Sequence, residues 1–303
     1  MPEVLSLAVA GQPLWMWLSF LTVILFLLWL DLGFFNRKDA VVSAGKSAAM
    51  WSMFACMSVG FGVLLYFFYE PNPEFYPREG GEREQAVIQY FTGYLLETAL
   101  AFDNIFVMSL VFTYFAVPRE YQHRVLFWGI LGAIVFRALF IGLGTAVVNQ
   151  FTWVLFIFAA FLIYTGVRML FGDDDEEPNM DDNFVLKLVR RFIPVTPDIY
   201  GRKFVKRLPD EHGVERLYAT PLLLALISVE VVDIIFAVDS VPAILAVTQD
   251  PFIVYTSNIF AILGLRSMYF MLSAAVERFK YLKYGLSLVL VLIGLKIFWN
   301  FLL

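Results

Sequence analysis

Two segments place carboxylates inside long apolar stretches of the chain, where charged side chains are rare. The first, residues 96–105, reads LETALAFDNI, and the second, residues 232–241, reads VDIIFAVDSV. At one constant offset they match acid with acid twice and polar residue with polar residue once: Glu97 with Asp233, Asp103 with Asp239, and Asn104 with Ser240. A carboxylate at bilayer depth is costly, so repeated carboxylates indicate an ion or proton pathway.

The side chains of this repeated motif offer only oxygen atoms to a ligand. Glu230 lies one helical turn before Asp233 and adds a fifth carboxylate to the set. Carboxylate, amide and hydroxyl oxygens suit Mg²⁺, Ca²⁺ or Mn²⁺ rather than Zn²⁺ or Cu⁺. The sequence therefore predicts a site for a hard divalent cation, with these candidate ligands: Glu97, Asp103, Asn104, Glu230, Asp233, Asp239 and Ser240.

Helical geometry divides these candidates between two faces. At about 100° per residue, the first acid of each copy shares a stripe with the following Asn or Ser, and Glu230 joins the stripe of the second copy. Asp103 and Asp239 fall about 120° away from it, so they can share the site only if the helix opens or the seam is wide. Pro242 removes a backbone hydrogen bond beside Asp239, which predicts an opening there.

Each copy of the motif is followed, one predicted span later, by an arginine in an apolar stretch: Arg137 and Arg266. Five crowded carboxylates repel one another, so cations or protons must balance them. The arginines can balance two carboxylates and a divalent ion two more, and departure of the ion would favour proton uptake. In the alternative, the acids are only structural partners of the arginines, but two arginines cannot account for five acids.

Composition indicates a membrane protein. Sixty per cent of the residues are hydrophobic and 16% are charged, which excludes an ordinary soluble domain. The single cysteine, Cys56, excludes a disulfide framework and a thiolate metal cluster. The expected fold class is all-α, a polytopic transmembrane helix bundle of about eight spans of roughly 20 residues each. We expect the spans at 14–35, 47–69, 88–115, 124–148, 151–171, 219–248, 252–275 and 281–301.

Basic residues are sorted between the loops of this eight-span arrangement. One side receives the Lys- and Arg-rich loops, and the other receives only Arg78 and Arg83 beside five glutamates. The positive-inside rule then puts both termini outside and the central loop in the cytoplasm. Spans three to five and six to eight each cross three times, so the second set is inverted relative to the first. The expected divisions are 1–87 with two spans and an acidic outer loop, 88–171 with the first repeat, 172–218 as a charged cytoplasmic loop, and 219–303 with the inverted repeat.

At its duplicated motif the chain resembles the TerC family of bacterial integral membrane proteins. The matching residues are Glu97-x5-Asp103-Asn104, Glu230-x2-Asp233-x5-Asp239-Ser240, and Leu30-Asp31-Leu32-Gly33 in the first span. The family looks related to the lysine-exporter superfamily, and its members are implicated in manganese export and in tellurite or alkaline-stress responses. The resemblance therefore implies Mn²⁺ efflux and a metal-binding role for the motif residues.

Residues and resemblance together predict a bacterial inner-membrane transporter that exports Mn²⁺ through a midplane acidic site, with protons as a candidate counter-ion. The expected partners are the lipid bilayer, the divalent ion and protons, without nucleic acid. No nucleophile or His-based zinc motif indicates an enzyme. The alternative is a non-transporting membrane scaffold that assists a metalation or secretion machinery or stress resistance. Asp31 is expected to pair with Arg37 or Lys38, and the acidic run at 173–177 to be a solvated loop.

Overall fold

The computed structural model describes residues 8–30, 43–73, 75–76, 81–151, 153–171, 187, 191, 193–209, 214–272 and 282–302. Within these ranges the chain forms eight α-helices, each overlapping one of the expected spans. They are α1 (Leu14–Leu30), α2 (Ala44–Phe68), α3 (Glu82–Tyr114), α4 (Arg119–Gln150), α5 (Val154–Phe171), α7 (Pro221–Leu245), α8 (Pro251–Leu272) and α9 (Leu282–Leu302). Asp31, Arg37, Lys38 and the acidic run at 173–177 lie outside the described residues.

Five of these helices, α2, α3, α4, α5 and α7, are long and apolar enough to cross a membrane. A bilayer needs roughly 20 helical residues, so α3 and α4, with 33 and 32 residues, must tilt or extend beyond it. Many large apolar side chains point outward from the bundle, among them Phe67, Leu95, Val135 and Leu292. Such a surface is stable against lipid rather than against water.

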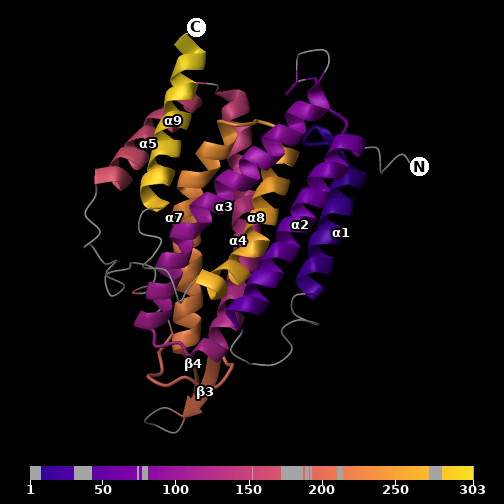
Figure 1. The fold of residues 1–303 in the computed structure, drawn as a ribbon. Helices are drawn as coiled ribbons and strands as arrows, with labels where there is room; N and C mark the ends of the chain where they lie inside the picture. The colour runs from indigo at the N-terminus through magenta and orange to yellow at the C-terminus, as the bar shows by residue number, and fades with distance from the viewer. Residues whose placement is uncertain are drawn as a thin grey trace.

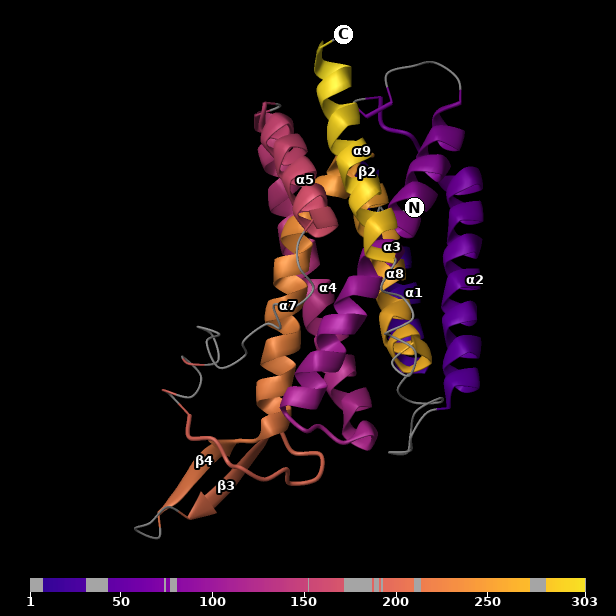
Figure 2. The same cartoon turned by 60° about the vertical axis from the view of Figure 1, so that its left-hand side comes forward.

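Successive helices run in alternating directions along the bundle (Figure 1). The start of α1 and the end of α9 lie at one end, here called the terminal end. A β-hairpin lies at the opposite end, here called the hairpin end (Figures 1 and 2). As a consequence α3 runs from the terminal end to the hairpin end, whereas α7 runs the other way.

The fold is mostly helical, as expected, with two short antiparallel strand pairs beside the helices. Strands β3 (Val205–Pro209) and β4 (Glu215–Ala219) pair antiparallel at the hairpin end, and β1 (Ala8–Val9) pairs with β2 (Gln12–Pro13) before α1. In the hairpin, charged residues interrupt the apolar ones, so the sequence lacks the alternation of apolar and polar residues that indicates a strand. The Lys206 ammonium lies 3.5 Å from the centre of the Tyr200 ring, a cation–π contact that holds this polar hairpin.

The packing of the helices is symmetric between two sets of three, α3–α5 and α7–α9. When α3, α4 and α5 are matched with α7, α8 and α9, each closely packed pair corresponds to another packed pair or to itself. Helix α3 packs along α8 and α4 along α7, while α5 and α9 pack against each other at one edge of the bundle (Figure 1). The α5–α9 contact is reciprocal, because a Cβ at Gly166 would lie 2.8 Å from the Ser287 carbonyl oxygen, and one at Gly294 2.8 Å from the Ala159 carbonyl oxygen. Each α5 residue of this contact precedes its α9 counterpart by 128 positions (294 − 166 and 287 − 159).

Candidate functional site

A buried arginine joins four helices in the middle of the bundle. Arg137 of α4 is only 1% exposed, and its guanidinium donates hydrogen bonds to Glu97 of α3 and Asp233 of α7. The Nη2 atom lies 3.1 Å from Asp233 Oδ1 and Nε lies 3.5 Å from Oδ2, so the guanidinium donates a hydrogen bond to each oxygen of this carboxylate. Asn258 of α8 completes the group. We call these residues, together with Ser240, the Arg137 cluster.

Neutral side chains complete the hydrogen bonding of the Arg137 cluster. Arg137 Nη1 lies 3.2 Å from both Ser240 Oγ and Asn258 Oδ1, while Asn258 Nδ2 donates to Glu97 Oε2 over 3.1 Å. A guanidinium suits this place because its planar donors can serve several acceptors at fixed angles, which a lysine ammonium cannot do. Buried charges are tolerated when they are paired and hydrogen-bonded in this way.

The predicted stripes of α3 and α7 explain how two distant motifs meet. Glu97 and Asp233 lie near the midpoints of their helices, and Ser240 follows Asp233 by two turns on the same face. Ala101 and Ala237, which separate the polar residues of each stripe, are 4% and 0% exposed, so they let the neighbouring helices approach closely. With both carboxylates ionised, two acids face one arginine and the cluster carries a net charge of −1.

The other candidate ligands lie outside the Arg137 cluster. Asn104 is buried beside the seam, and its Oδ1 has no hydrogen-bond partner among the described residues. Asp103 and Asp239 are half-buried on other faces of α3 and α7, as their helical positions predict. Glu230 is also half-buried and packs against Gly132 of α4, where a Cβ would collide with its carboxylate.

The motif acids are therefore not gathered into one coordination sphere. Among the described residues, no three Asp, Glu, His or Cys side chains come together as a metal site. Helix α7 also continues through Pro242 to Leu245, so the opening expected beside Asp239 is not present in this structure. The expectation of an opened helix was wrong here. Pro242 lies only three residues before the end of α7, so most backbone hydrogen bonds of the helix are unaffected.

Asn258 is the residue of the cluster that sequence reasoning missed. It lies in the run Thr256-Ser257-Asn258 of α8, a helix that does not contain the repeated motif. All three side chains are fully buried, yet the hydroxyls of Thr256 and Ser257 only bond back to carbonyls of their own helix. The signal in the sequence was an amide side chain within a predicted membrane span, where polar side chains are rare and costly.

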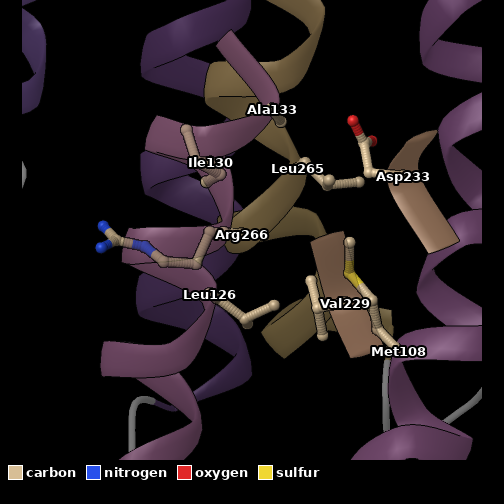
Figure 3. A pocket seen from close by; sticks show the side chains of 9 residues that line it. Met108, Leu126, Ile130, Ala133, Val229, Asp233, Leu265 and Arg266 are labelled. Atoms are coloured by element: carbon tan, nitrogen blue, oxygen red, sulfur yellow. The ribbon is translucent and has the colours of Figure 1, made fainter. Parts of the chain in front are cut away.

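Next to Asp233 lies a small apolar cavity of about 10 Å³, the space that one water molecule needs. Figure 3 shows the Leu265 side chain reaching toward Asp233 across it, whereas the guanidinium of Arg266 points away from Asp233. Arg266, predicted to balance charge as Arg137 does, thus lies on a different side of α8 from the cluster. The cavity is lined by Met108, Leu126, Gly129, Ile130, Ala133, Val229, Asp233, Leu265 and Arg266.

A second polar group lies outside the membrane-spanning helices, at the terminal end. Asp250 precedes α8 and accepts hydrogen bonds from the Tyr69 hydroxyl and, over 2.9 Å, from the backbone N–H of Phe252. Burial raises the pKa of Asp250, and the bond from Tyr69 offsets part of that rise. Burial likewise raises the pKa values of Tyr69 and Tyr76. This group caps α8 and fixes it to the end of α2.

Comparison with known proteins identifies the family of the chain. Residues 82–302, which include the whole Arg137 cluster, match the model of the integral membrane protein TerC family. The chain belongs to the TerC family. It is therefore a multi-pass integral membrane protein, as composition and the five long apolar helices indicate. No solved structure matches it.

Several bacterial relatives share most of this TerC-family chain. The membrane protein STKORF319 of Myxococcus xanthus is 47% identical over 287 residues, which cover 94% of this chain and 83% of the relative. Relatives named membrane-bound redox modulator Alx are 45% identical in Photorhabdus laumondii, over 94% of this chain and 86% of the relative, and 44% identical in Escherichia coli K12, over the same shares. The similarity thus spans nearly the full length of the chain.

Proposed function

We propose that this TerC-family protein exports a hard divalent cation through the Arg137 cluster, with Mn²⁺ as the first candidate. The observation that carries the proposal is the buried pair Glu97 and Asp233, held at the midpoints of two apolar helices that run in opposite directions. Acids at bilayer depth mark ion pathways, and transporters commonly bind their substrates near the midplane, where two repeats meet.

The helix packing supports an inverted-repeat construction for this transporter. The reciprocal α5–α9 contact has a parallel in the inner helices, where a Cβ at Gly93 would lie 2.8 Å from Ser257 Oγ and one at Gly129 3.2 Å from Val229 Cγ1. Between the two repeats, Gly93 corresponds to Val229 at a spacing of 136 positions (229 − 93), and Gly129 corresponds to Ser257 at a spacing of 128 positions (257 − 129). The Gly93–Ser257 contact of one side therefore has the Val229–Gly129 contact as its counterpart. We infer that the chain crosses the membrane eight times, and that a two-fold axis in the membrane plane relates crossings three to five to crossings six to eight.

Arg137 acts in this proposal as a tethered cation that holds the two carboxylates while no ion is bound. An entering divalent ion competes with the guanidinium for Glu97 and Asp233, and Ser240 and the Asn258 carbonyl supply further oxygen. All of these are ligands that Mn²⁺, Mg²⁺ and Ca²⁺ accept. When the ion leaves, either the guanidinium or a proton must balance the acids again, which would couple export to proton uptake.

Asp103 and Asp239 take part after a conformational change. Each lies one residue before the polar residue of its motif, Asn104 or Ser240, so a rotation of about 100° of its helix would bring it onto the cluster face. Alternating access in repeat transporters moves one bundle against the other around a fixed site. Asp103 and Asp239 are then ligands of a later state, while Glu230 lies on the α4–α7 seam.

The charge of the loops sets the proposed orientation. The hairpin end carries Lys203, Lys206, Arg207 and Arg216, and we place it in the cytoplasm, with both termini outside and the chain in the bacterial inner membrane. Export then runs from the hairpin end to the terminal end. Cys56 is the only cysteine of the chain, so the proposed function involves no internal disulfide.

Flux through purified protein tests this function. In proteoliposomes of known orientation, Mn²⁺ should cross faster than in protein-free vesicles, and Mg²⁺ and Ca²⁺ added in excess should compete to different degrees. A pH gradient acid on the terminal side should accelerate movement toward that side if protons are exchanged. A non-transporting scaffold would give the flux of empty vesicles for every ion.

A further inference from the structure

We propose that the apolar cavity beside Asp233 is the remnant of the cytoplasmic entry route to the cluster, and that Met108, Leu126, Val229 and Leu265 form the gate that closes it. The inference rests on the proposed function, since it assigns a route and a gate to the same site. Its residues belong to four helices, α3, α4, α7 and α8, which also supply the Arg137 cluster.

The position of the cavity along the helices gives the direction of the route. Met108 lies nearer the end of α3 than Glu97, and Leu126 nearer the start of α4 than Arg137. Both of these helix ends lie at the hairpin end (Figure 1). Val229 precedes Asp233 on α7, which begins at the hairpin end. The cavity therefore extends from Asp233 toward the hairpin end.

The equivalent place on the other side of the cluster is filled. By the spacings of the repeat contacts, the counterparts of Val229, Gly129 and Met108 are Gly93, Ser257 and Ile244. A Cβ at Gly93 would lie 2.8 Å from Ser257 Oγ and 2.9 Å from Ile244 Cδ1, so no space remains there. Ile244 and Ser257 are both 0% exposed. The structure thus combines a packed terminal side with a residual cavity on the hairpin side.

The two sides also differ in the residue that faces the acids. The counterpart of Arg137 at a spacing of 128 is Leu265, whose side chain extends toward Asp233 (Figure 3). Apolar constrictions close ion routes because a narrow apolar passage excludes water, and small displacements of their side chains rehydrate them. Met108 suits such a gate, since its unbranched thioether changes rotamer readily.

Thiol accessibility tests the gate without depending on transport. In a Cys56→Ala background, Met108→Cys and its counterpart Ile244→Cys are compared, with a small charged methanethiosulfonate reagent added to one face of oriented vesicles at a time. Leu126→Cys and its counterpart Val254→Cys form a second pair, in case one variant of the first fails to fold. Leu126 and Val254 are 2% and 0% exposed, so the pair is matched in burial.

We expect Met108→Cys and Leu126→Cys to react with reagent added from the hairpin face and to lose that reaction when Mn²⁺ is present. Ile244→Cys and Val254→Cys should stay unreactive from the same face. Equal labelling of both members of a pair, or labelling of neither Met108→Cys nor Leu126→Cys, would overturn the gate. If the labelling pattern holds but the wild-type protein moves no Mn²⁺, the route stands and the cargo proposed above fails.

Discussion

Replacing Arg137 by glutamine removes the positive charge that two buried carboxylates share. Asp233 would lose both of its hydrogen bonds to the guanidinium, and Glu97 would keep only the bond from the Asn258 amide. Breaking a buried ion pair by removing one partner costs about 3–5 kcal/mol. Each hydrogen bond to a charged group is worth about 1.5–3 kcal/mol. The three bonds that Glu97 and Asp233 lose therefore give an upper limit that exceeds the cost of breaking the ion pair. Protonation of one acid relieves part of the loss.

We therefore expect Arg137→Gln to lower the free energy of unfolding by about 3–5 kcal/mol at neutral pH. At about 1.4 kcal/mol per power of ten, this change raises the ratio of unfolded to folded protein by between two and four powers of ten. Denaturant unfolding in detergent micelles, followed by circular dichroism, measures it. Arg119→Gln is the matched control, because Arg119 is the exposed first residue of the same helix and should change stability by less than about 0.5 kcal/mol.

A compensating variant separates charge from shape. Combining Arg137→Gln with Glu97→Gln and Asp233→Asn leaves no buried charge in the cluster, so most of the lost stability should return. If Arg137→Gln is no less stable than Arg119→Gln, or if neutralising the two acids destabilises it further, the arginine is not what balances these carboxylates.

Three further changes test the packing and the polar groups. Gly294→Ala should destabilise the protein by about 1–3 kcal/mol, because its Cβ would press on the Ala159 carbonyl. Gly285→Ala in the same helix meets open space and should not, and equal thermal unfolding of the two would contradict the close α5–α9 contact. Gly132→Ala should displace Glu230, one of the candidate ligands, and slow Mn²⁺ flux, whereas the Cβ of Gly142→Ala meets open space; a flux equal in both variants would remove Glu230 from the candidate ligands. The raised pKa of Asp250 means that the folded state keeps its proton to higher pH than the unfolded state, so wild-type stability falls as pH rises above the ordinary aspartate pKa. Asp250→Asn lacks this loss, and its stability relative to wild type should therefore increase between pH 4 and pH 7 in thermal unfolding; a constant difference would show that Asp250 titrates normally.

The sequence predicted the helices and the core of the site because both follow from local pattern. Apolar length fixed the helical segments, and the repeated acids on matching stripes predicted that Glu97 and Asp233 face a common seam. A buried arginine one span later was a sufficient signal for Arg137. These expectations needed only helical periodicity and the cost of burying charge.

The remaining features depend on how helices pack, which periodicity does not determine. Arg266 looked equivalent to Arg137 in sequence, yet it lies one position beyond the counterpart Leu265, and one residue turns a side chain by about 100° around the helix. Asn258 enters the cluster only because α8 packs between α2, α3 and α4. The hairpin escaped notice because its strands are short and rich in charge.

Initial rates of Mn²⁺ flux in oriented proteoliposomes test most directly whether ions cross at the Arg137 cluster. The comparison uses wild type, Glu97→Gln, Asp233→Asn and the control Asp198→Asn, which changes an exposed carboxylate before the hairpin. The account predicts that Glu97→Gln and Asp233→Asn, inserted and folded as wild type, lose flux to the level of empty vesicles, while Asp198→Asn keeps it. Wild-type rates in both cluster variants would contradict the account, because the acids would then serve only to hold Arg137.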